Sequence, residues 1–199
     1  MRRIGLFGGS FDPPHNAHLA LAHVALQHLS LDELRWVPAG QQWQKTRELG
    51  SADDREAMVR LAIAGEARFV LERCELRRAG PSYTLDTVTE LQAASPDAVW
   101  FLVIGQDQYA QLHTWHGWTD LLRKVTLAVA CRDIANVHPS PEVAAVPHAM
   151  LTLPLPPTPV SSTAIRRAIA EGRDFTDMVP AAVARYIDQH RLYSGNPRS

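Results

Sequence analysis

Short apolar segments alternate along this chain with longer segments of helical periodicity, and this alternation restricts the fold more than any other feature of the sequence. Six apolar segments have the length and composition of strands buried in a parallel sheet: Arg3 to Phe7, Leu34 to Val37, Arg68 to Glu72, Val99 to Ile104, Leu127 to Ala130 and Met150 to Leu153. Four helices are expected from apolar residues at three- and four-residue spacings: Ala17 to Leu29, Asp53 to Ala64, Tyr83 to Ala93 and Thr163 to Ala170. The pattern predicts an α/β fold with a doubly wound parallel sheet, whose ligands bind at the edge where the strands end.

The chain has the length of one domain. Open α/β sheets of about this size usually form one continuous core, so we expect residues 1–199 to fold as a unit. A further helix is expected from Ala181 to about His190, so that a C-terminal helical part, about residues 160–192, packs on the sheet. Two stretches, Pro38 to Gly50 and Asn136 to Pro147, have irregular composition. We interpret the first as an active-site loop and assign no chemistry to the second.

Composition and charge exclude several classes of protein. The formal net charge of −1 gives no general attraction for polyanions, so binding to nucleic acid or to an acidic membrane is not expected. No apolar segment has the length of a signal peptide core or of a membrane span, which makes the cytoplasm the expected compartment. Cys74 and Cys131 lie far apart without metal-ligand spacing, which favours buried reduced thiols over a disulfide or a zinc site. The sequence leaves a homo-oligomer open.

The strongest functional signal is the string Gly8-Gly9-Ser10-Phe11-Asp12-Pro13-Pro14-His15-Asn16-Ala17-His18, directly after the first predicted strand. Glycines at a strand end let a phosphate or sugar approach the backbone, and the following helix start offers unpaired N–H groups with partial positive charge. Imidazoles three residues apart can face one ligand and donate hydrogen bonds to phosphate oxygens. Each residue alone also has a purely structural explanation, such as a tight turn or a polar helix start. The ordered string as a whole predicts an anion site.

A second anion site is expected near the end of the predicted core. Ser161 and Ser162 are N-cap candidates for a helix that begins near Thr163, and Arg166 follows about one turn later. Taken alone, this segment fits a capped amphipathic helix with the surface arginines Arg166 and Arg167. Two helix starts at one sheet edge would, however, hold a triphosphate from both sides.

The string GGSFDPPHNAH resembles the GGxFDPxHxGH signature of the nucleotidyltransferases that share the HxGH motif with class I aminoacyl-tRNA synthetases. VSSTAIR, at residues 160–166, resembles their ISSTxIR motif. The IGQD block at residues 104–107, Trp115, and PSYT at residues 81–84 resemble the branch that acts on nicotinate nucleotides. This resemblance covers nearly the whole chain. It implies a Rossmann-like nucleotidyltransferase fold and adenylyl transfer from ATP to nicotinate mononucleotide, giving nicotinate adenine dinucleotide and pyrophosphate in NAD biosynthesis.

The resemblance also implies roles for individual residues. His15, His18 and Arg166 would contact the ATP phosphates as the catalytic set, with His18 and Arg166 most important for rate. ATP would also be bound by Gly8, Gly9, Ser10, Phe11, Gly105, Asp107, Ser161, Ser162, Thr163 and Ile165. Nicotinate mononucleotide would be bound by Lys45, Tyr83, Thr84, Trp115, His116 and Arg132.

Several of these positions have a structural alternative. Asp107 would accept hydrogen bonds from ribose hydroxyls, or it caps a short helix. Trp115 would stack on a pyridine ring, or it packs in the core, as we expect for Trp100 and Trp118. Lys45 would close over phosphates, or it is a solvated loop lysine. Two positions depart from the family pattern: Ala17 stands where the family has glycine, and His116 where it often has tyrosine.

The reaction explains why the sequence shows no nucleophile elbow and no carboxylate cluster. A phosphate monoester has a second pKa of about 6, so as acceptor it is already anionic and needs no general base. Positioning and charge stabilisation then suffice. Mg²⁺ is expected on the triphosphate, held mainly by phosphate oxygens and water, with no dedicated protein metal site.

Two other functions remain to be weighed. One is adenylyl transfer to another acceptor, such as nicotinamide mononucleotide or phosphopantetheine, against which Trp115 and the PSYT block argue. The other is a non-catalytic nucleotide sensor, which only the replaced glycine at Ala17 supports. A class I synthetase is excluded by the chain length and by the lack of an RNA-binding module.

Overall fold

The computed structural model describes residues 1–40, 49–132, 137–155 and 158–194. Its centre is a six-stranded sheet with the order β3-β2-β1-β4-β5-β6, in which every neighbouring pair is parallel. The strands are β1 (Arg3–Gly9), β2 (Glu33–Pro38), β3 (Phe69–Leu71), β4 (Val99–Gly105), β5 (Thr126–Cys131) and β6 (Met150–Pro154). All six were predicted, as was the doubly wound parallel sheet. Strands β2 and β3 are added on one side of β1, and β4, β5 and β6 on its other side. Sheets with this strand order bind ligands between β1 and β4, where the order changes direction.

The long helices agree with the sequence pattern, whereas the short ones were not foreseen. The predicted helices are α1 (Asn16–His28), α2 (Ala52–Ile63), α4 (Thr84–Ala94), α8 (Ser162–Ala170) and α9 (Ala181–His190). The additional ones are α3 (Cys74–Arg77), α5 (Gln106–Ala110), η1 (Leu112–Thr114), α6 (Trp118–Lys124), α7 (Pro141–Ala144) and η3 (Thr176–Met178). Segments of one or two turns are too short to show helical periodicity. One of them, α7, lies in a stretch that we expected to be irregular.

The sheet is buried on both faces, because alternate residues of each strand point to opposite sides. On β1, Phe7 packs in a core cluster with Trp36, whereas Ile4 and Leu6 belong to a second cluster on the other face. Helices α1, α2, α8 and α9 contribute to the first cluster, and α4 and α6 to the second. Trp100 lies in the second cluster, where Trp118 also packs. These two tryptophans therefore have the packing role that the sequence predicted.

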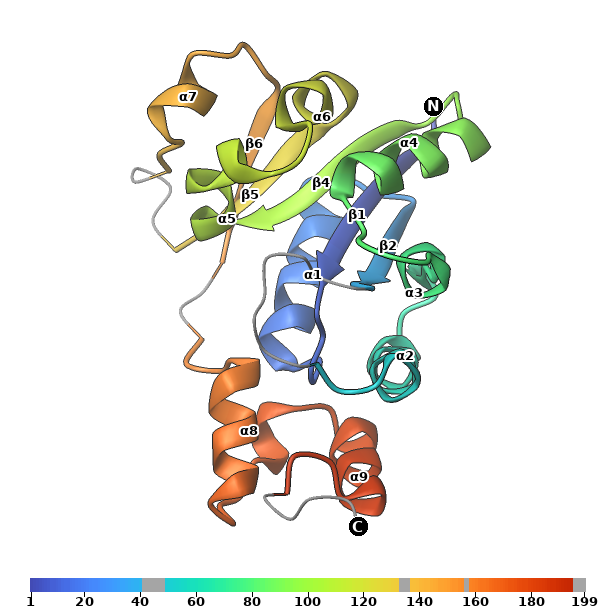
Figure 1. Ribbon diagram of the computed structural model, residues 1–199, viewed down its shortest axis with the longest axis vertical. Helices are drawn as coiled ribbons and strands as arrows, with labels where there is room; N and C mark the ends of the chain where they lie inside the picture. Colours follow the sequence, from blue (N-terminus) through green and yellow to red (C-terminus); the bar gives the residue numbers. More distant parts are fainter. Residues whose placement is uncertain (41–48, 133–136, 156–157, 195–199) are drawn as a thin grey trace.

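The C-terminal helices lie beyond the edge where β1 and β2 end (Figure 1). We predicted that this part packs on the sheet. Helix α9 is present as predicted, and its main neighbours are α2 and η3. Its buried residues Val183 and Ile187 extend the first core cluster. The Tyr186 hydroxyl also donates a 3.0 Å hydrogen bond to Asp54 of α2. The C-terminal part is therefore joined to the region just past the strand ends.

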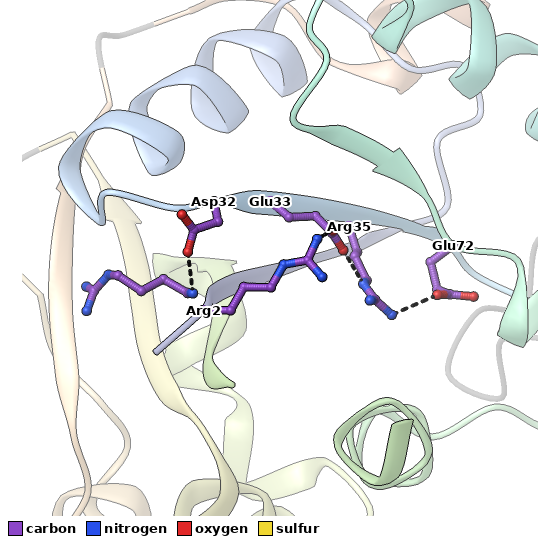
Figure 2. Close-up of polar contacts among 6 residues, drawn as sticks. Arg2, Asp32, Glu33, Arg35 and Glu72 are labelled. Atoms are coloured by element: carbon purple, nitrogen blue, oxygen red, sulfur yellow. Dashed lines mark hydrogen bonds and ion pairs between the residues drawn. The ribbon is translucent and has the colours of Figure 1, made fainter. Parts of the chain in front are cut away.

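A chain of charged side chains joins the starts of β1 and β2 to the end of β3 (Figure 2). Arg35 donates to Glu33 at 2.5 Å and to Glu72 at 3.3 Å, and Arg2 also pairs with Glu33. This network begins at the amino ends of the strands, so it braces the sheet away from the loops that follow β1 and β4.

The sequence predicted buried reduced cysteines and no membrane-spanning helix. Both cysteines are free: Cys131 is buried, as predicted, and Cys74 is only partly buried. Among the described residues, no helix is long and apolar enough to cross a bilayer.

Candidate active site

A cavity of about 470 Å³ opens at the point where the strand order reverses. The ends of β1 and β4, the start of α4 and the segment around Trp115 form its walls. Among the predicted site residues, those that line it are Gly8, Gly9, Ser10, His18, Tyr83, Thr84, Gly105, Trp115 and His116. Residues predicted separately for the two substrates therefore share one cavity.

The two glycines at the end of β1 make room for different partners. Nothing in the described protein lies within 4 Å of where a Cβ of Gly8 would stand, and Gly8 lines the cavity. A side chain there would occupy space that a ligand can use. A Cβ on Gly9 would instead meet the ring of Phe11 at 3.0 Å. Phe11 has a left-handed backbone, with φ of 46°, which its ring stabilises by burial against Phe7 and Trp36.

His15 and His18 form a stacked pair at the start of α1, with ring centroids 3.7 Å apart. His15 is the N-cap residue, and its backbone N–H donates to Nδ1 of His18 at 3.2 Å. Because Nδ1 of His18 is an acceptor, the proton of a neutral ring must be on Nε2. Only His18 of the pair lines the cavity. The helix start therefore holds His18 in the tautomer that has Nε2–H as a donor.

Burial keeps both imidazoles uncharged at neutral pH. It lowers the pKa of His15 to about 4. Burial, together with the neighbouring charge that a protonated His15 would carry, lowers the pKa of His18 well below its ordinary value. The pair therefore offers hydrogen bonds rather than positive charge, and the charge that a triphosphate needs must come from elsewhere.

The second motif lies directly against the first. Ser161 caps α8 by accepting a 3.2 Å hydrogen bond from Ala164 N–H. The Ser162 hydroxyl donates to the carbonyl oxygen of Pro13 at 2.9 Å. Arg166 Nη1 donates to the carbonyl oxygen of Asp12 at 2.7 Å, and Nη2 donates to Thr163 Oγ1 at 3.2 Å. The two motifs are therefore in direct contact, and Arg166 supplies a cation beside the first motif, although the described residues that line the cavity include none of Ser161, Ser162, Thr163 and Arg166.

Other predicted residues lie elsewhere. Phe11 and Ile165 are 1% and 0% exposed and pack in the first core cluster. Asp107 is exposed in the first turn of α5, whose N-cap is Gly105, so Asp107 is not the cap that we considered. Asp107 and the exposed Arg132 are not among the described residues that line the cavity. Lys45 lies outside the described residues.

The far end of the cavity is aromatic. The rings of Tyr83 and His116 lie 4.4 Å apart at an angle of 32°. Trp115 packs against the second core cluster and also lines the cavity, so its ring is available for the proposed stacking. A flat pyridine ring fits such a wall by stacking. Tyr83 is the N-cap residue of α4, so the first N–H groups of that helix border the same space.

Sequence reasoning missed several polar residues of this wall. Glu75 lines the cavity and accepts a 2.8 Å hydrogen bond from Thr87 Oγ1, and burial raises its pKa. Ser82 also lines it, and its buried hydroxyl has no hydrogen-bond partner among the described residues. Gln108 is a further lining residue. Thr87 lines the cavity one turn after Tyr83, so helical spacing from Tyr83 could have indicated it. No sequence pattern indicated Glu75.

Arg55 is the most informative missed residue, because it is a cation with 3% exposure. Its guanidinium donates to the carbonyl oxygens of Ser10 at 3.1 Å, Ala39 at 2.6 Å and Gly50 at 3.0 Å. It therefore braces the turn after β1 from behind. Its position carried a signal: it shares the face of α2 with the buried Met58 and Val59, where an arginine is unusual.

The donor set suits phosphate groups better than a resident metal ion. Among the described residues, no group of three or more His, Cys, Asp or Glu side chains could hold a metal. The available donors are N–H groups, hydroxyls, an imidazole and a guanidinium. An arrangement of this kind can bind anions and stabilise charge on a transferring phosphoryl group.

Comparisons with known proteins show the family and the fold. The model of the cytidylyltransferase-like family matches residues 6–168. A protein from Methylibium petroleiphilum, named a probable nicotinate-nucleotide adenylyltransferase, is 58% identical over 97% of this chain and 93% of its own length. One of the same name from Albidiferax ferrireducens is 44% identical over 97% of this chain and 98% of its own. The solved Plasmodium falciparum nicotinic acid mononucleotide adenylyltransferase, complexed with NaAD, shares the fold over the full length of both chains, with a TM-score of 0.79 at 17% identity.

Proposed function

The chain belongs to the cytidylyltransferase-like family, within its nicotinate-nucleotide adenylyltransferases, and we propose that it transfers the adenylyl group of ATP to nicotinate mononucleotide. The products are nicotinate adenine dinucleotide and pyrophosphate, so the enzyme acts in NAD biosynthesis. The observation that carries this proposal is the contact of Ser162 and Arg166 with the turn that precedes His15 and His18. This contact joins the start of α8 and the cation of Arg166 to the turn that leads into α1, whose His18 lines the cavity.

ATP binds along the β1 turn in this proposal. The space beside Gly8 accepts the nucleotide close to the backbone, and the Nε2–H group of His18 donates to a phosphate oxygen. Arg166, with the hydroxyls of Ser161 and Thr163, neutralises the departing pyrophosphate. Asp107 remains a proposed ribose ligand because the first turn of α5 borders the cavity at Gly105 and Gln108.

The acceptor nucleotide lies toward the aromatic end. Its pyridine ring stacks on Trp115, and the start of α4 at Tyr83 and Thr84 offers N–H groups to the nicotinate carboxylate. An oxygen of its phosphate attacks the α-phosphorus of ATP. A new O–P bond forms as the bond from the α-phosphorus to the bridging oxygen of pyrophosphate breaks, and both electrons of that bond leave with pyrophosphate. The attacking oxygen is already anionic, so no protein base is required.

Magnesium would reach this site bound to the ATP phosphates. The described residues offer phosphate-binding donors rather than a cage of carboxylates, which fits an ion held mainly by the triphosphate and water. The bound ion neutralises phosphate charge. We also propose a cytoplasmic location, since free thiols such as Cys74 and Cys131 are typical of a reducing compartment.

The test is pyrophosphate release by the purified protein. It is incubated with Mg-ATP and, in separate reactions, with nicotinate mononucleotide, nicotinamide mononucleotide or phosphopantetheine. We expect the highest kcat/KM with nicotinate mononucleotide. Faster turnover of another acceptor would replace the proposed substrate, and nucleotide binding without release of pyrophosphate from any mixture would favour a sensor.

A further inference from the structure

Asp12 connects the first motif to three distant parts of the chain. Its residue is 0% exposed. The Tyr193 hydroxyl donates to Oδ1 at 2.6 Å, and the Gly50 N–H group donates to Oδ2 at 3.3 Å. The backbone carbonyl oxygen of Asp12 accepts the 2.7 Å hydrogen bond from Arg166. The same residue therefore binds the C-terminal segment through its side chain and orients the proposed catalytic arginine through its backbone.

These contacts are closely fitted. A Cβ on Gly50 would stand 2.7 Å from Asp12 Oδ1 and 3.7 Å from the Tyr193 hydroxyl, so glycine is what allows this approach. Tyr193 lies just after α9 with φ of 62°, a left-handed conformation that is uncommon for residues other than glycine. Leu192 beside it is buried in the core. Tertiary contacts thus hold Tyr193 in a conformation that delivers its hydroxyl to Asp12.

We propose that Tyr193 is a positioning residue for adenylyl transfer: its hydroxyl holds the Asp12 carboxylate, and through Asp12 it fixes the carbonyl oxygen that orients the Arg166 guanidinium. This inference rests on the proposed function. A buried carboxylate that loses a donor must move toward other donors or toward water. Because the side chain and the carbonyl group of Asp12 are attached to the same Cα atom, such a movement displaces the anchor of Arg166. Displacement of a charge-stabilising group slows the chemical step more than it weakens binding of the acceptor.

The electrostatics agree with a hydroxyl that stays protonated. Burial, and next the negative charge of Asp12, raise the pKa of Tyr193, while Arg166 acts in the opposite direction. Tyr193 therefore remains a donor throughout the neutral range.

The chain offers a matched control in Tyr186. Its hydroxyl also donates to an aspartate, Asp54, at 3.0 Å, and also joins the C-terminal part to α2. Asp54 accepts side-chain hydrogen bonds from Tyr186 and Ser51, whereas Arg166 is anchored on the Asp12 carbonyl oxygen and Thr163. Tyr186→Phe therefore removes a comparable hydrogen bond without disturbing the proposed relay.

The experiment compares kcat and KM of the wild-type protein, Tyr193→Phe and Tyr186→Phe with Mg-ATP and nicotinate mononucleotide, alongside urea unfolding. We expect Tyr193→Phe to lower kcat about tenfold, while KM for nicotinate mononucleotide changes less than about twofold. Tyr186→Phe should keep wild-type kcat, although both variants lose similar stability. Equal kcat values for the two variants would overturn the inference.

A second perturbation reaches Asp12 from its other side. Gly50→Ala should lower kcat in the same way, because the added methyl group presses on Oδ1. In an Asp12→Asn background, Tyr193→Phe should lower kcat less than about twofold, since the relay is already broken. A full tenfold loss in that background would show that Tyr193 acts by another route. If the wild-type protein releases no pyrophosphate, the proposed function fails. If the wild-type protein releases pyrophosphate and Tyr193→Phe has the same kcat, only this inference fails.

Discussion

The Ser162 hydroxyl donates a 2.9 Å hydrogen bond to the carbonyl oxygen of Pro13, across 149 positions of the sequence. Pro13 lies two residues before the N-cap of α1, and Ser162 is the first residue of α8. The bond therefore joins the starts of two helices, each with unpaired N–H groups and a partial positive charge. Their joint field is suited to a highly charged anion, and the residues around this contact provide direct tests.

Arg166 and its neighbour Arg167 form a matched pair. Arg166 contacts the first motif, whereas Arg167 is mostly exposed and pairs with Glu171. Arg166→Ala should lower kcat about 100-fold, because it removes the cation proposed to stabilise the departing pyrophosphate. Arg167→Ala should keep wild-type kcat, since an exposed ion pair contributes little. Steady-state kinetics of both variants would refute the assignment if their losses were alike.

The tautomer of His18 can be tested with two substitutions that replace the imidazole by a side-chain amide. In His18→Gln, the amide oxygen can accept the bond from His15 N–H while the NH₂ group reaches the position of Nε2. In His18→Asn, the shorter side chain can accept this bond but does not reach the cavity as far. We expect Asn to lower kcat about 100-fold and Gln to retain about tenfold more activity than Asn. Equal rates, measured by pyrophosphate release, would exclude the Nε2–H donor.

His15 should make the free energy of unfolding depend on pH. Burial lowers its pKa from the ordinary value of 6.5 to about 4 in the folded protein. Between these values the unfolded chain binds a proton that the folded chain excludes, so this contribution to stability is present above pH 6.5 and is lost as pH falls toward 4. One such proton corresponds to at most about 1.4 kcal/mol per pH unit.

Urea unfolding at several pH values between 7 and 4 measures this effect. His15→Asn should show a shallower loss of stability with falling pH than the wild-type protein, because it lacks one of the two depressed imidazoles. His18 contributes in the same direction, so part of the slope should remain. Parallel curves for the two proteins would contradict the burial of a neutral His15.

Removal of magnesium should affect turnover and leave the fold unchanged. Because the described residues include no metal-binding group of side chains, an excess of EDTA should abolish pyrophosphate release without shifting the thermal unfolding midpoint of the nucleotide-free protein. Restoring Mg²⁺ should restore activity. A lower unfolding midpoint in EDTA alone would reveal a structural metal ion instead.

Prediction from sequence worked where a signal is contained in a short segment. The apolar runs gave all six strands, and the cap and spacing at Ser161 to Arg166 gave α8. The first motif was located because its glycines and histidines follow one strand without interruption. Short helices such as α3 and α5 were missed, because one turn has no periodicity to detect.

The strand and helix pattern, the parallel sheet and the position of the two motifs could be predicted from the sequence, because these depend on neighbours within a few positions. Three features became visible only in the folded chain: Tyr193 donates to Asp12, 181 positions away, Arg55 braces the turn after β1, and Ile165 is buried in the core. Such contacts arise when a buried polar group must find its partner among elements that only folding brings together. No local pattern specifies that partner.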